Sequence, residues 1–102
     1  MPDFVNPFSG VVPRKLTQEE LIRAIRLAIA AEHEAVHVYM AQADATDHPL
    51  AKRVLTDIAN EEIVHVGEFT TLLKHLNPEE EEYLAEGEAE VREMMEEMGE
   101  GE

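Results

Sequence analysis

The sequence contains no cysteine and no tryptophan, and only 5% of its residues are aromatic. Without cysteine the chain makes no disulfide, offers no thiolate zinc site and has no thiol nucleophile. Positive charge is also scarce, because 8 Lys and Arg residues stand against 23 Asp and Glu residues, a formal charge of −15. A nucleic-acid-binding surface needs a basic footprint, so this composition argues against nucleic acid as a partner.

Long apolar runs and targeting signals are missing as well. No stretch approaches the ~20 apolar residues that a membrane span requires. The start, MPDFVNPFSG, has neither the basic region nor the apolar segment of a secretory signal. We therefore expect a cytoplasmic protein with no membrane partner. A chain of 102 residues has room for one small domain with a modest core.

Caps and prolines predict where the first helix begins and ends. Residues 1–16 carry three of the five prolines and show no helical period, so we expect an extended leader there. Thr17 and Glu20 have the spacing of a capping box, which predicts a helix that starts at about residue 18. The segment TDHPL, residues 46–50, interrupts the apolar pattern. The first helix is therefore predicted over about 18–45.

Two further helices follow from the same signals. A second helix is predicted over 49–76, with Thr46 or Asp47 as its cap and Pro49 in its first turn. A third is predicted over 78–98, with Asn77 as its cap and acidic residues in its first turn, where the helix dipole favours them. Residues 99–102 are expected to form an acidic tail or linker.

Apolar positions along the first two helices alternate mostly four and three residues apart, which is the seam of closely packed helices. On the first helix the seam consists of Ile22, Ile25, Ile29, Glu32, Val36, Tyr39 and Ala43. On the second it consists of Ala51, Leu55, Ile58, Glu62, His65, Phe69, Leu72 and Leu76. Three polar residues thus occupy positions that the packing should bury.

Register brings these three polar residues together. A connection this short makes the two helices an antiparallel hairpin. Glu32 and Glu62 both lie about 15 residues from a turn centred on residue 47, so they should meet at one height, ~22 Å from the turn. His65 follows Glu62 by three residues and lies on the same side of its helix.

Burying two carboxylates without compensation costs several kcal/mol, and neither seam carries Lys or Arg. A bound divalent cation would compensate. Carboxylate and imidazole ligands together suit iron, with manganese and zinc as competitors. The alternative is a buried polar network that fixes the register of the helices. A second Glu-x-x-His step, Glu34 and His37, lies off the seam and is interpreted as a solvated face.

Glu32, Glu62 and His65 are half of the ligand set of a known kind of metal site. Ferritin-like di-metal sites in four-helix bundles take one Glu from each of two helices and a Glu-x-x-His step from each of the other two. This hairpin supplies one Glu and one such step, and a two-fold dimer would complete both bundle and ligand set. The sequence therefore predicts an all-α protein. Its domain, residues 17–98, is an antiparallel two-helix hairpin plus a shorter C-terminal helix that dimerises into a ferritin-like four-helix bundle.

The segments AEHEAVHVY, residues 31–39, and NEEIVHV, residues 60–66, resemble the encapsulated ferritins, short ferritin-like proteins packaged in encapsulin shells. The resemblance covers roughly residues 17–76. It implies a ferroxidase that oxidises Fe²⁺ to Fe³⁺ at a di-iron centre formed by Glu32, Glu62 and His65 of two protomers. It also implies a ring-shaped decamer of five dimers, and a surrounding shell that stores the iron.

The resemblance implies two further roles. Tyr39 matches a family tyrosine near the iron centre, although a core tyrosine that needs a hydroxyl partner is the alternative. Glu34 matches a position where the family gathers cations beside the ligands. Position 31, acidic in other members, is Ala31 here, so the path of the ion is expected to differ, with His33 or His37 contributing.

The rival hypothesis is a non-catalytic, metal-stapled helical oligomer, a metal-binding or sensing module in which zinc or manganese only holds the hairpins together. A purely structural oligomer is a third possibility. Oxygen-dependent turnover of Fe²⁺ separates the first hypothesis from the other two, and metal-dependent assembly without turnover marks the second.

From residue 79 to residue 102, half of the residues are Glu. A heptad-like stripe there predicts packing on a neighbouring subunit, and consists of Leu84, Gly87, Val91, Met94 and Met98. Family members usually reach the shell through an apolar, glycine-containing C-terminal peptide, which GEGE is not. The chain is therefore interpreted as truncated, as fused to a shell protein through its acidic stretch, or as docked by its leader.

Overall fold

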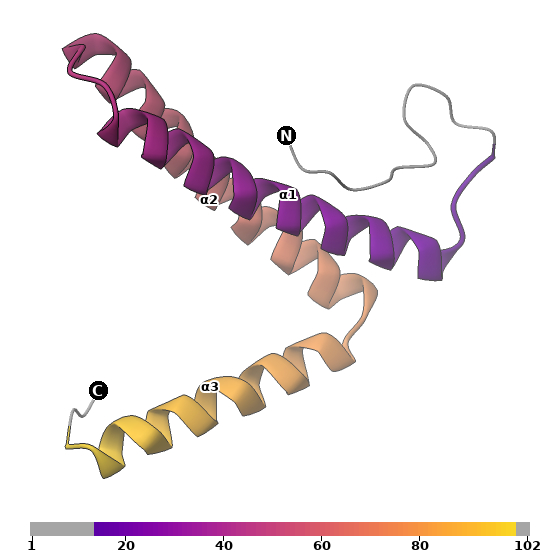
Figure 1. The fold of residues 1–102 in the computed structure, drawn as a ribbon. Helices are drawn as coiled ribbons and strands as arrows, with labels where there is room; N and C mark the ends of the chain where they lie inside the picture. Colours follow the sequence, from indigo (N-terminus) through magenta and orange to yellow (C-terminus); the bar gives the residue numbers. More distant parts are fainter. Residues whose placement is uncertain (1–13, 100–102) are drawn as a thin grey trace.

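The structure, a computed structural model, describes residues 14–99. These residues form three α-helices and no strand: α1 (Gln18–Asp44), α2 (Pro49–Leu76) and α3 (Glu79–Glu97). α1 and α2 pack as an antiparallel hairpin, and α3 turns away from it (Figure 1). The predicted all-α fold of two long helices and a shorter C-terminal helix is thus confirmed, and the helix bounds agree to within one residue. Residues 1–13 of the expected leader (1–16) and the last three residues of the expected tail (99–102) lie outside the described residues.

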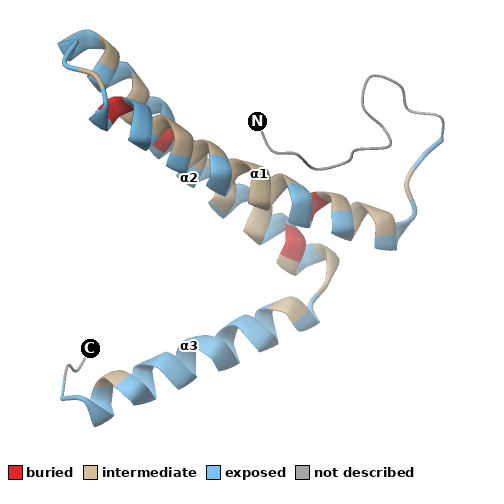
Figure 2. Cartoon of the chain, viewed as in Figure 1, coloured by how far each residue is buried: buried red, intermediate tan, exposed pale blue. Residues whose placement is uncertain are grey.

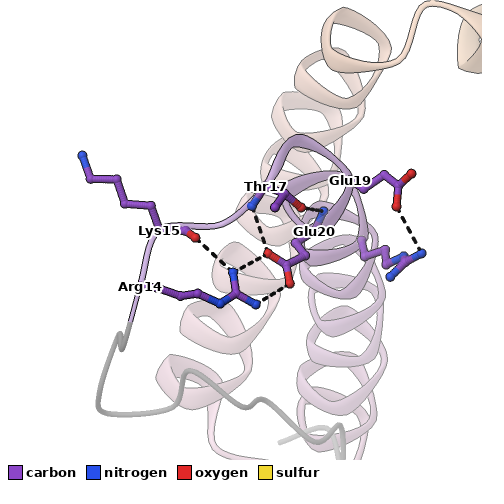
Figure 3. Close-up of polar contacts among 6 residues, drawn as sticks. Arg14, Lys15, Thr17, Glu19 and Glu20 are labelled. Atoms are coloured by element: carbon purple, nitrogen blue, oxygen red, sulfur yellow. Dashed lines mark hydrogen bonds and ion pairs between the residues drawn. The ribbon is translucent and has the colours of Figure 1, made fainter.

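The predicted capping box starts α1. The Thr17 hydroxyl oxygen accepts a hydrogen bond from the Glu20 amide at 3.2 Å, and a Glu20 carboxylate oxygen accepts one from the Thr17 amide at 2.9 Å. Arg14 donates to both oxygens of Glu20, at 2.7 and 2.6 Å (Figure 3). The Arg14 hydrogen bond, followed by that of the Thr17 amide, lowers the pKa of Glu20 from 4.5 to about 2. A charged carboxylate therefore fixes the first turn.

The expected cap of α2 is wrong. His48 is the cap, and its ring nitrogen Nδ1 accepts a hydrogen bond from the Ala51 amide at 3.2 Å. Thr46 stabilises the turn before the helix instead, since its hydroxyl accepts a hydrogen bond from the His48 amide at 3.2 Å. His48 directly precedes the first helical residue, and its Nδ1 reaches the helix's unpaired amides as an Asp oxygen would. Pro49 is the first helical residue, as predicted.

The expected cap of α3 is wrong too. Asn77 ends α2, and its amide donates to the Leu73 carbonyl at 2.8 Å. Pro78 precedes α3 and makes no side-chain cap hydrogen bond. Because the connection between the two helices is so short, Asn77 is occupied in closing one helix and does not cap the next.

The predicted seam of α1 is confirmed, since all seven of its positions are buried or half-buried. In α2 the buried line lies one residue further along at two positions. Ala59 is 0% exposed and Leu73 is buried, whereas Ile58 and Leu72, which were expected in the seam, are 39% and 40% exposed. The small Ala59 side chain allows α1 to approach closely at that position, which turns Ile58 outward.

α3 contributes little to the core. All its residues from 81 to 94 are exposed, and the predicted apolar stripe is uncovered in the single chain (Figure 2). The Arg26 guanidinium on α1 makes two hydrogen bonds to the Glu80 carboxylate, at 3.0 and 2.6 Å, and so ties the first turn of α3 to the hairpin. Within residues 14–99, none of the helices has the length and apolarity needed to span a membrane.

Candidate metal centre

Three potential metal ligands converge between α1 and α2. His65 Nδ1 on α2 lies 2.9 Å from Glu32 Oε2 on α1 and 2.8 Å from Glu62 Oε1 one turn earlier on α2. One ligand atom from each of the three residues lies within 4.8 Å of the others. The equal distance of Glu32 and Glu62 from the turn, read from the sequence, therefore corresponds to a contact in the folded hairpin.

The cluster has two carboxylate acceptors but only one imidazole nitrogen that could donate a hydrogen to them. One imidazole nitrogen faces both carboxylates, and it carries at most one hydrogen, so it donates fully to only one carboxylate at a time. Partial burial is the largest single influence on His65 and lowers its pKa, but the hydrogen bonds and negative charges of Glu62 and Glu32 together outweigh it. The pKa of His65 is therefore raised above 6.5.

A divalent cation fits this donor set better than a proton does. Carboxylate oxygens and imidazole nitrogens bind such metals at about 2.0–2.2 Å, so ligand atoms around one ion lie within about 4.4 Å of one another. The three ligand atoms all lie within 4.8 Å of one another, close to that spacing. An ion would satisfy all three ligands at once, and the combination suits iron, manganese or zinc.

The cluster opens toward a side of α2 that α1 leaves uncovered. Ile58, His65 and Leu72 are seven residues apart and form one line along the helix. The His65 side chain is 44% exposed, similar to its two apolar neighbours on that line. His65 thus lies on a line of α2 whose two apolar members a single hairpin does not bury.

The other predicted site residues lie outside the cluster. Tyr39 is half-buried, two turns along α1 from Glu32, or ~10 Å along the helix axis. Its hydroxyl makes no hydrogen bond to another described residue. Glu34, His33 and His37 are exposed, and none belongs to the group of three converging ligands, the one such group among residues 14–99. Every member of that group was predicted from the sequence.

Comparison with known proteins gives consistent matches. The sequence model of the rubrerythrin family matches residues 23–102. A crystal structure of the encapsulated ferritin domain from Pyrococcus furiosus is similar over 90% of this chain and 94% of that chain, with a TM-score of 0.80 and 38% identity.

Two curated proteins are also similar. The chain is 47% identical over 75 residues to the encapsulin nanocompartment cargo protein EncC of Myxococcus xanthus, which is 74% of this chain and 58% of that protein. It is 39% identical over 90 residues to the ferritin-like-encapsulin shell fusion protein of P. furiosus, which is 88% of this chain and 26% of that protein. The match spans less than two thirds of either relative.

Proposed function

This chain belongs to the encapsulated ferritins, a group of ferritin-like proteins, and from that premise we propose that it is a ferroxidase that oxidises Fe²⁺ to Fe³⁺ inside an encapsulin nanocompartment. The observation that carries the proposal is the convergence of Glu32, Glu62 and His65, with two carboxylates on a single imidazole nitrogen. Such a set has the composition of half a ferritin-like di-metal site.

A second copy of the chain completes the site in this proposal. The line of Ile58, His65 and Leu72 supports it, because burying that apolar surface against a two-fold partner brings two ligand sets face to face. Four carboxylates then repel one another until cations arrive, so metal binding favours the dimer. The uncovered stripe of α3 supports further association, and a ring of five dimers is the assembly that the family resemblance implies.

The residues of the chain bind and position the substrate ions. Glu32 and Glu62 neutralise the charge of Fe²⁺, and His65 gives up the proton on Nδ1 when that nitrogen becomes a ligand. Two Fe²⁺ ions held together supply two electrons, enough to reduce one dioxygen with two protons to hydrogen peroxide. Tyr39 on the same side of α1 is proposed to lie beside the iron centre, and Glu34 to gather cations on their way to it.

The proposed partner outside the assembly is an encapsulin shell protein. One relative is named as a cargo protein and the other as a fusion to a shell. In this proposal the chain lies within an encapsulin shell, where the ferric product is stored.

The test of the proposal is rapid-mixing Fe²⁺ oxidation in air, followed by the absorbance of the ferric product. Wild-type protein is expected to show a fast phase that Glu62→Ala abolishes. Glu61→Ala is the matched control, because it removes the neighbouring exposed carboxylate, which lies outside the cluster. Equal fast phases in both variants would contradict the site. Metal-dependent assembly of wild-type protein without a fast phase would favour the non-catalytic metal-stapled oligomer.

A further inference from the structure

A second group of potential ligands lies on the exposed face of α1, separate from the candidate metal centre. His33, Glu34 and His37 read His-Glu-x-x-His along a continuous helix. Residues four apart on a helix have Cβ atoms about 5–6 Å apart and lie on one face. Two histidines at this spacing on a helix are the ligand pair that holds zinc in proteins with this motif.

Both imidazoles are available for a ligand. His33 and His37 are exposed, and neither makes a hydrogen bond or ion pair with another residue in 14–99. The other described histidines differ: His48 caps α2, and His65 belongs to the candidate metal centre. His75 is exposed but has Thr71 and Glu79 four residues away, so it has no histidine partner on its helix.

Glu34 adds negative charge beside the pair. It precedes His37 by three residues, the same spacing at which Glu62 Oε1 comes within 2.8 Å of His65 Nδ1 on α2. Exposed side chains change rotamer on the ps–ns timescale, so Glu34 has access to the same approach. No Lys or Arg lies within four residues of the pair on either side to oppose a cation.

We propose that His33 and His37 form a second, solvent-facing metal site for imidazole-preferring divalent cations, Cu²⁺, Ni²⁺ or Zn²⁺. The affinity of nitrogen ligands rises from Fe²⁺ through Ni²⁺ to Cu²⁺. Two imidazoles therefore bind Cu²⁺ or Ni²⁺ more tightly than Fe²⁺, and the candidate metal centre differs in offering two carboxylates and one imidazole. Water completes the coordination at this exposed position, and no hydrolytic activity follows from it. This site does not depend on the proposed oxidation of iron.

The first test is pulsed EPR of metal-free full-length protein with one equivalent of Cu²⁺, which counts the coordinated imidazoles. Wild-type protein is expected to show two equivalent imidazoles on one ion. His37→Ala should reduce the count to one and weaken Ni²⁺ binding, measured by calorimetry, on the order of tenfold or more because the chelate is lost. His33→Ala should have the same effect.

Two controls make the test specific. His75→Ala removes an exposed histidine without a partner and should leave the Ni²⁺ affinity unchanged. His33→Ala combined with Ala41→His restores the four-residue spacing one turn along the exposed face of α1, and should recover two-imidazole coordination. The proposal is overturned if His37→Ala binds Ni²⁺ as His75→Ala does, or if the double variant behaves like His33→Ala alone. Circular dichroism of each variant establishes that the helices are intact.

Discussion

The sharpest prediction concerns the stability that metal confers, and the perturbation is Glu62→Gln. This change keeps the shape of the side chain but removes one of the two carboxylates that contact His65 Nδ1. In metal-free protein it should change the melting temperature little, because the lost attraction between Glu62 and His65 is offset by the relieved repulsion between the Glu62 and Glu32 carboxylates. The destabilising effect should appear only when the metal is bound.

The magnitude follows from binding linkage. Anaerobic Fe²⁺ at one hundred times its dissociation constant stabilises the folded protein by about 2.7 kcal/mol. For a domain of this size that corresponds to roughly 10–20 °C in melting temperature. Loss of a residue that only orients a metal ligand already weakens binding by about 10- to 100-fold, so loss of one of three direct ligands should weaken it at least as much. The stabilisation at the same Fe²⁺ concentration then falls to about 1.4 kcal/mol or less, so the iron-induced shift should be halved or smaller.

The assay is differential scanning calorimetry with and without anaerobic Fe²⁺ at one fixed protein concentration, since oligomer formation makes the melting temperature depend on concentration. Glu61→Gln is the matched control, with the same substitution one residue away on an exposed side chain. Equal iron-induced shifts in Glu62→Gln, Glu61→Gln and wild type would refute the assignment of Glu62 as a ligand.

Three further predictions follow from the fold. Ala59→Leu overfills the contact between α1 and α2, where Ala59 is 0% exposed. It should lower the free energy of unfolding, measured in urea, by about 1–3 kcal/mol. The same change at exposed Ala85 on α3 should have little effect. The pKa of Glu20 is lowered to about 2, so its stabilising contribution is fully present above pH 4.5 and is lost as the pH falls toward 2. Glu20→Gln should therefore flatten the acid side of a plot of unfolding free energy against pH. An unchanged plot would contradict the capping role. Arg26→Gln removes the ion pair to Glu80 and should speed amide hydrogen exchange in the first turn of α3, while global stability changes by less than about 1 kcal/mol, as for other exposed pairs.

The helices could be predicted from the sequence because their signals are local. Thr17 and Glu20 define the start of α1, and Pro49 defines the start of α2, within a turn of chain. The convergence of Glu32, Glu62 and His65 was predicted for a different reason. Glu32 and Glu62 are equally far from a short turn, and a hairpin converts that symmetry directly into contact.

What could not be predicted depended on tertiary packing or on competition between neighbours. The buried line of α2 passes through Ala59 instead of Ile58 because a small side chain gives closer helix packing than the apolar period alone indicates. His48 caps α2 although Asp47 has the better intrinsic preference, since the chain geometry at the turn decides which side chain reaches the first amides. The direction of α3 is set by few contacts, among them those of Arg26 with Glu80.

The central claim is that two chains share one iron-oxidising centre. It is tested most directly by titrating metal-free protein with Fe²⁺ in air, at several protein concentrations, and measuring the amplitude of the fast oxidation phase. The account predicts that the amplitude saturates at about one iron per chain, since two ligand sets hold two ions. It also predicts that the amplitude per chain falls when dilution separates the dimer. A fast phase whose amplitude per chain is the same for dissociated monomer would contradict a shared centre.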